Sequence, residues 1–94
     1  MYSNVTTIAD VRAANRAAGY YFFSRATCKF FGSSVVSILY KNRCFVTREL
    51  GYDLTRYYYT VRRFDPHTAK IETVGEFQAY DNLTAAREAA KAVK

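Results

Sequence analysis

The stretch RYYYTVRRFDPHTAKIETVGEFQAY, residues 56–80, decides the fold of this chain. It contains two runs rich in β-branched and aromatic residues, 56–64 and 70–80, on either side of Asp65-Pro66-His67-Thr68. Such runs are typical of strands, and proline supplies the fixed φ that a turn needs. We therefore predict a β-hairpin over residues 56–80.

Charge and hydrophobicity predict the register of this hairpin. When opposite charges and apolar side chains face each other across two strands, each such pair adds stability. A slip of one residue would move every side chain to the other face of the sheet. The predicted pairs are Phe64–Ile71, Arg63–Glu72, Val61–Val74 and Asp65–Lys70.

The residues upstream predict a second hairpin. Runs of β-forming residues at 35–40 and 44–47 flank Lys41-Asn42-Arg43, and Asn is a preferred turn residue. Together the two hairpins predict a four-stranded antiparallel sheet.

Helical signals lie at both ends of the sequence. Thr7 followed by Asp10 is typical of a capping box, and it predicts a helix over residues 7–18 that Gly19 terminates. Ser24 predicts the start of a short second helix that ends at Gly32. Asp81 and Asn82 are candidate N-caps for an alanine-rich helix over residues 83–93. We therefore expect one α+β domain, residues 1–94, with two N-terminal helices (the second short) and a C-terminal helix on one face of the sheet.

Positive charge is concentrated in the first half of the chain. The net charge is +6, and residues 11–48 contain seven Lys or Arg side chains but no Asp or Glu. Like charges repel, so such a field does not favour folding; its usual use is attraction of a polyanion or an acidic protein surface. The alternative is a scattered surface that only confers solubility. The candidate binding residues are Arg12, Arg16, Arg25, Lys29, Lys41, Arg43 and Arg48.

The strand predicted over residues 56–64 puts Arg beside Tyr on both of its faces. Because Arg can bind phosphates and Tyr can stack on bases, worth about 1–3 kcal/mol per base, this strand is a candidate for binding DNA or RNA. The alternative is that one face is core and the other is a solvated surface on which Arg63 pairs with Glu72. The candidate binding residues here are Arg56, Tyr57, Tyr59, Arg62 and Arg63.

Groups that carry chemistry are few in this sequence. His67 is the single histidine and lies in a turn, while Cys28 and Cys44 fall in apolar-periodic segments. There is no C-x-x-C pair that would predict zinc and no glycine-rich phosphate loop. We therefore expect no catalytic residue, metal or cofactor, and a protein that is not an enzyme, although a small thiol enzyme using either cysteine is a weaker alternative.

Cysteine usage and the absence of long apolar runs predict the compartment. Residues 1–4 do not resemble a secretory signal, and without one, two cysteines are more often reduced thiols than a disulfide. The longest apolar run, residues 20–23, is far below the roughly 20 residues that span a bilayer. We therefore expect a cytoplasmic protein that does not associate with membranes.

Residues 58–90, YYTVRRFDPHTAKIETVGEFQAYDNLTAAREAA, resemble small proteins carried by phages and plasmids, which end in a similar "TVR-F…G-F-Y…AA" pattern. Anti-CRISPR inhibitors, which occlude a bacterial surveillance complex rather than act on it chemically, are among such proteins. The same residues resemble the strand-strand-helix core of AP2-type DNA-binding domains, which implies that Arg62 and Arg63 face DNA. The tryptophan positions of that family are absent here.

These resemblances imply two functions. The first is a non-enzymatic inhibitor from a phage or other mobile element, specifically an anti-CRISPR, whose basic, Tyr-rich surface covers part of a Cas complex. The second is a small DNA- or RNA-binding module that uses the strand rich in Arg and Tyr.

Overall fold

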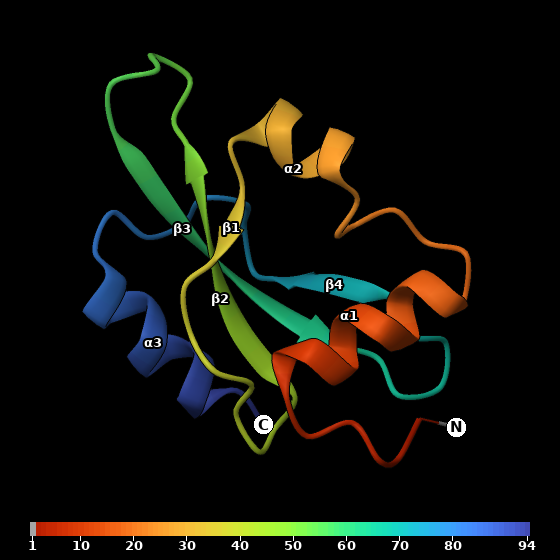
Figure 1. Cartoon of the computed structure of the whole chain (residues 1–94). Helices are drawn as coiled ribbons and strands as arrows, with labels where there is room; N and C mark the ends of the chain where they lie inside the picture. The colour runs from red at the N-terminus through yellow and green to blue at the C-terminus, as the bar shows by residue number, and fades with distance from the viewer. Residues whose placement is uncertain (1) are drawn as a thin grey trace.

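The computed structural model describes residues 2–94, which form three helices and a four-stranded antiparallel sheet with the strand order β1-β2-β3-β4. The predicted α+β class is confirmed (Figure 1). The elements in chain order are α1 (Ile8–Ala17), α2 (Arg25–Phe31), β1 (Ser34–Val35), β2 (Cys44–Leu50), β3 (Tyr57–Phe64), β4 (Ile71–Val74) and α3 (Leu83–Ala92).

The first two helices begin at the predicted caps. The Thr7 hydroxyl accepts a hydrogen bond from the Asp10 N–H at 3.2 Å, and the Asp10 carboxylate accepts one from the Thr7 N–H at 3.1 Å. Ser24 caps α2 through the Thr27 N–H, and Gly32 ends α2 with φ +59°, in the left-handed region that glycine tolerates. The starts of both helices are therefore set by capping side chains, and the end of α2 is set by a glycine.

The predicted register of the central hairpin is confirmed. In the β3–β4 pair, Phe64 lies opposite Ile71 and Val61 opposite Val74. Arg63 also lies opposite Glu72. The Asp65 N–H continues the pairing beyond β4 by donating to the Lys70 carbonyl at 2.9 Å.

The second strand of this hairpin is shorter than predicted. It ends at Val74 rather than at residue 80, because Gly75 adopts φ +77° and turns the chain out of the sheet. The chain returns only at Tyr80, which pairs with Tyr59 in an isolated bridge. The excursion places Phe77 outside the strands, where its side chain lines a hollow.

The upstream hairpin also departs from the prediction. The strand expected over residues 35–40 is reduced to β1, and β2 runs on to Leu50. The Ser37 hydroxyl accepts the Val46 N–H at 2.8 Å, so a side chain takes the position that a strand carbonyl would occupy. The ladder is therefore interrupted after one further backbone bond, from the Val36 N–H to the Val46 carbonyl.

Asn42, at the turn of this hairpin, binds the end of α3. Its amide nitrogen donates to the carbonyls of Ala90 and Val93 at 2.7 and 2.9 Å, and its carbonyl accepts the Cys44 N–H at 3.0 Å. The last carbonyls of a helix lack an N–H donor four residues on, and that of Ala90 otherwise accepts the Val93 N–H at 3.4 Å. Asn42 therefore caps α3 from a distant part of the sequence.

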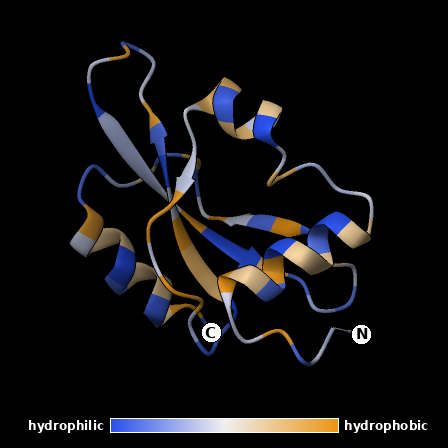
Figure 2. Ribbon diagram, viewed as in Figure 1, coloured by the Kyte–Doolittle hydropathy of each residue, from blue (hydrophilic) through white to orange (hydrophobic). Residues whose placement is uncertain are grey.

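The helices cover both faces of the sheet, so the expectation of a single covered face is wrong. Cys44 and Val46 of β2 pack in a cluster with Ala86 and Ala90 of α3, whereas Phe45 packs with residues of α1. Neighbouring strand residues point to opposite faces, so β2 contributes to both clusters. Figure 1 shows α1 and α3 on opposite sides of the strands, and in Figure 2 apolar and polar colours alternate along α3.

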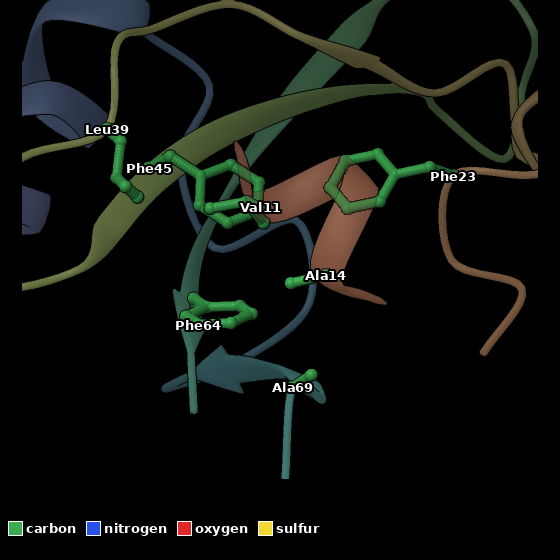
Figure 3. Close-up of a cluster of buried hydrophobic side chains, with 7 residues drawn as sticks. All are labelled: Val11, Ala14, Phe23, Leu39, Phe45, Phe64 and Ala69. Atoms are coloured by element: carbon green, nitrogen blue, oxygen red, sulfur yellow. The ribbon is translucent and has the colours of Figure 1, made fainter. Parts of the chain in front are cut away.

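The cluster under α1 contains the larger side chains. Figure 3 shows Phe45 and Phe64 from the sheet, Val11 and Ala14 from α1, and Phe23 from the segment before α2. Val11, Phe45 and Phe64 are fully buried. This cluster fixes α1 and the start of α2 over the same face of the sheet.

Within residues 2–94, none of the helices combines the length and the apolar composition that crossing a bilayer requires.

Candidate functional site

Three arginines predicted to bind a partner line one hollow, which we call the arginine groove. Arg12 and Arg16 come from α1 and Arg25 from the first turn of α2, and all three are exposed. The groove has a volume of about 500 Å³. The other residues that line it are Phe22, Phe23, Cys28, Ser33, Ser34, Val35 and Thr47.

The charge of the arginine groove is not neutralised by a nearby carboxylate. None of the residues that line it is Asp or Glu. Within residues 2–94 the ion pairs are Arg62–Glu49 and Lys91–Glu88, and neither involves a groove arginine. The Arg12 guanidinium lies 5.5 Å from the centre of the Phe23 ring, which positions its charge without cancelling it. The groove therefore offers three charges to an anionic ligand.

The other early basic residues lie elsewhere. Lys29 is exposed in the last turn of α2. Lys41 and Arg43 line a separate hollow with the N-terminal segment. Arg48 belongs to the set of β2 side chains that points toward α3, and its guanidinium lies 4.3 Å from the centre of the Tyr57 ring. The seven residues therefore occupy at least three parts of the surface.

The strand rich in Arg and Tyr, β3, is covered by other elements along most of its length. Tyr59 packs against the cluster under α3, and Arg56 lies over the Tyr58 ring at 5.7 Å. Arg63 is half-buried beside Glu72. Only Tyr57, at the start of the strand, keeps 45% of its surface exposed.

Arg62 points to the α1 side of the sheet, where it forms an ion pair with Glu49. The Arg62 Nη2 lies 3.2 Å from the Glu49 Oε2, and the Glu49 side chain is 1% exposed. Arg62 also donates from Nε to Thr47 at 3.0 Å and from Nη1 to Thr73 at 2.6 Å. The charge of Arg62 is therefore neutralised inside the protein.

A second hollow of about 310 Å³ opens above this ion pair, and we call it the phenylalanine pocket. Its walls include the rings of Phe22, Phe31 and Phe77, from three separate segments. It shares Phe22 and Ser33 with the arginine groove, so the two hollows adjoin. The remaining residues that line it are Thr27, Glu49 and Arg62.

Sequence reasoning missed the phenylalanine pocket. Its walls come from the loop before α2, from α2 and from the loop after β4, and no local pattern links them. One signal was present: Thr47 and Glu49 are two residues apart in β2, as are Thr60 and Arg62 in β3, so each pair shares one face of its strand. Polar residues that share one face of two paired strands indicate a polar network there.

The groups considered for catalysis lie apart. His67 is exposed in the turn after β3, Cys28 lines the arginine groove, and Cys44 is buried on the α3 side of the sheet. Both thiols are free. Burial raises the pKa of the Cys44 thiol, and the charge of Arg63 offsets part of that rise. Within residues 2–94 no three His, Cys, Asp or Glu side chains gather as a metal site requires.

No curated protein and no solved structure matches this chain. The model of a family described as "Family of unknown function (DUF7447)" matches residues 7–91, which include every helix and strand apart from the last residue of α3. The chain therefore belongs to the DUF7447 family.

Proposed function

We propose that this protein is a non-enzymatic binding protein that docks an acidic protein surface in its arginine groove. The observation that carries the proposal is the convergence of Arg12, Arg16 and Arg25 on one hollow that no carboxylate lines. Three guanidinium groups held together repel one another, and an anionic partner removes that cost. Arginine also binds carboxylates in a bidentate geometry that favours specific docking.

A protein partner is favoured over a nucleic acid by the mixed character of the groove. Phe22, Phe23 and Val35 form apolar wall beside the arginines. Protein interfaces combine an apolar centre with a charged rim, whereas half or more of the hydrogen bonds to DNA go to the sugar-phosphate backbone. Arg62, which the nucleic-acid hypothesis requires on an open strand face, is paired with Glu49.

In its finer form, the proposal is that the protein is an inhibitor from a phage or other mobile element, an anti-CRISPR that covers part of a Cas surveillance complex in the host cytoplasm. The resemblance of residues 58–90 supports this form. An inhibitor that acts by covering its target needs contact area rather than catalytic groups, and a standard interface buries about 800 Å² of each partner. The accessible surface of the chain, 6119 Å², can supply that area.

Co-elution with purified Cas surveillance complexes in size-exclusion chromatography tests this proposal. We expect wild-type protein to co-elute and the triple variant Arg12→Glu/Arg16→Glu/Arg25→Glu to elute alone. A control with the same change of net charge, Arg56→Glu/Lys70→Glu/Lys94→Glu, should still co-elute because these residues lie outside the groove. If the groove variant co-elutes as wild type does, the groove is not the binding site.

A gel-shift titration with duplex and single-stranded DNA and RNA separates the two classes of partner. We expect no shift by wild-type protein at low salt. A shift whose log affinity falls with log salt by about 0.7–0.9 per phosphate contacted, and which the groove variant lacks, would assign the groove to nucleic acid instead.

A further inference from the structure

The phenylalanine pocket lies beside the arginine groove, and the proposed function leaves it unused. The two hollows share Phe22 and Ser33. Phe31 and Phe77 form the exposed rim of the pocket with 47% and 49% of their surface open to solvent, and their ring centres are 6.4 Å apart. A partner that fills the groove therefore also meets an apolar opening.

The buried carboxylate does not make the pocket a cation site. Glu49 accepts hydrogen bonds from Thr60 at 2.7 Å, from Ser33 at 3.1 Å and from Arg62 at 3.2 Å. Its charge is balanced by that of Arg62, so the pair presents no net charge to an occupant. The pocket therefore favours a neutral group.

The walls of the pocket favour an aromatic ring. The Arg62 guanidinium lies 5.2 Å from the centre of the Phe22 ring and 5.5 Å from that of Phe77. A guanidinium has five N–H donors, and Arg62 uses one each for Thr47, Thr73 and Glu49. An aromatic ring can pack against the phenylalanine side chains with its apolar face. The Arg62 N–H groups that have no partner within residues 2–94 then contact the π-system of that ring or water.

The size of the pocket sets the scale of the occupant. About 310 Å³ is at the lower end of the 300–1,000 Å³ that ligand pockets span. A single side chain suits this volume, and in protein interfaces an aromatic side chain seated in a central pocket commonly carries most of the binding free energy.

We propose that the phenylalanine pocket receives one aromatic side chain of the acidic partner, so that the partner presents an aromatic residue flanked by carboxylates. The aromatic ring packs against the Phe31 and Phe77 rings at the rim of the pocket while the carboxylates meet Arg12, Arg16 and Arg25. This inference rests on the proposed function of the groove. We call this aromatic side chain the anchor, because it adds an apolar contact to the charge attraction at the arginines.

The absence of tryptophan from this chain allows a direct test. The probe is a nine-residue glutamate peptide with one central tryptophan, and the reference peptide has alanine at that position. We expect the tryptophan emission to shift to the blue when the peptide binds, because the ring leaves water. We also expect the tryptophan peptide to bind about tenfold or more tightly than the alanine peptide in a competition assay.

Variants of the pocket wall locate the anchor. Phe31→Ala and Phe77→Ala should each abolish both the blue shift and the gain over the alanine peptide; both rings are about half exposed, so folding should survive. Tyr21→Ala is the control, because Tyr21 is also aromatic, is 76% exposed and does not line the pocket. An equal loss in Tyr21→Ala would overturn the assignment of the anchor to the pocket.

The outcomes distinguish failure of the anchor from failure of the groove. If both peptides bind equally, and binding is lost at high salt or in the groove triple variant, the arginine groove is confirmed as the binding site for acidic partners. The proposal that the phenylalanine pocket receives an aromatic side chain is then overturned. If only the tryptophan peptide binds and the groove variant does not weaken it, the ring binds without the arginines and the joint mode is overturned. If neither peptide binds at low salt, both proposals fail.

Discussion

The carboxylate of Glu49 and the guanidinium of Arg62 lie 3.2 Å apart beneath the phenylalanine pocket, with 1% and 11% of their side chains exposed. The pair joins two neighbouring strands, β2 and β3, on the face of the sheet that α1 covers. Each charge is tolerated there because the other is present.

Replacing Arg62 with Met should therefore destabilise the protein strongly. The change leaves the Glu49 charge without its partner, and breaking a buried pair in this way costs about 3–5 kcal/mol. Urea denaturation followed by circular dichroism measures the loss. The double variant Glu49→Gln/Arg62→Met should recover part of the stability, because no unpaired charge remains. If its loss equals the sum of the losses in Arg62→Met alone and Glu49→Gln alone, the residues do not act as a pair.

Asn42 should govern the stability of α3. Replacing it with Ala removes three hydrogen bonds, to Ala90, Val93 and Cys44, each worth about 0.5–1.5 kcal/mol, so we expect a loss of about 2–4 kcal/mol. Replacing it with Asp should also destabilise, because a carboxylate then faces the helix carbonyls. Hydrogen exchange of the α3 amides should accelerate in both variants, whereas unchanged protection would show that α3 does not depend on this cap.

The capping box of α1 should make stability depend on pH in acid. The Thr6 N–H, and then the Thr7 hydroxyl and N–H, bind the Asp10 carboxylate and hold its pKa below the usual 3.8. Because the pKa of Asp10 is lower in the folded state than in the unfolded state, its carboxylate stabilises the fold at pH values above the unfolded-state pKa. This stabilisation is lost as the pH falls through the folded-state pKa. We therefore expect the Tm of the Asp10→Asn variant to fall less than the Tm of wild type when the pH is lowered from about 5 to about 2. Equal slopes in thermal melts would contradict this assignment.

The two thiols should differ in reactivity. Cys28 lines the arginine groove, whereas Cys44 is buried and burial raises its pKa, so less thiolate is available to react at a given pH. In native protein near neutral pH, we expect the Cys44→Ser variant to react readily with a disulfide reagent and the Cys28→Ser variant to react only slowly. Denaturant should make the two rates similar. A fast reaction at Cys44 in the native state would show that the α3 side opens easily.

Sequence alone predicted the elements that depend on local chemistry. The caps at Thr7 and Ser24 and the register that pairs Val61 with Val74 follow from contacts between residues close in sequence or directly opposite in one hairpin. Charge and hydrophobicity favoured the same register there, so few alternatives competed.

The features that sequence missed depend on distant side chains. Ser37 replaces a strand carbonyl for Val46, and Glu49 is buried because Ser33, Thr60 and Arg62 bind it. A glutamate in a strand ordinarily indicates a solvent face. Because the partners of Glu49 lie far from it in the sequence, the buried network and the pocket above it could not be predicted. The sequence could group the groove arginines only by their charge.

β2 has a consequence for how this protein unfolds. Phe45 is fully buried in the cluster under α1, while its neighbours Cys44 and Val46 are fully buried in the cluster under α3. Fraying of this one central strand therefore exposes both sides of the molecule to water at once. Loss of β2 therefore disrupts both helical layers together, so we expect the protein to unfold in one cooperative transition despite its two separate hydrophobic clusters.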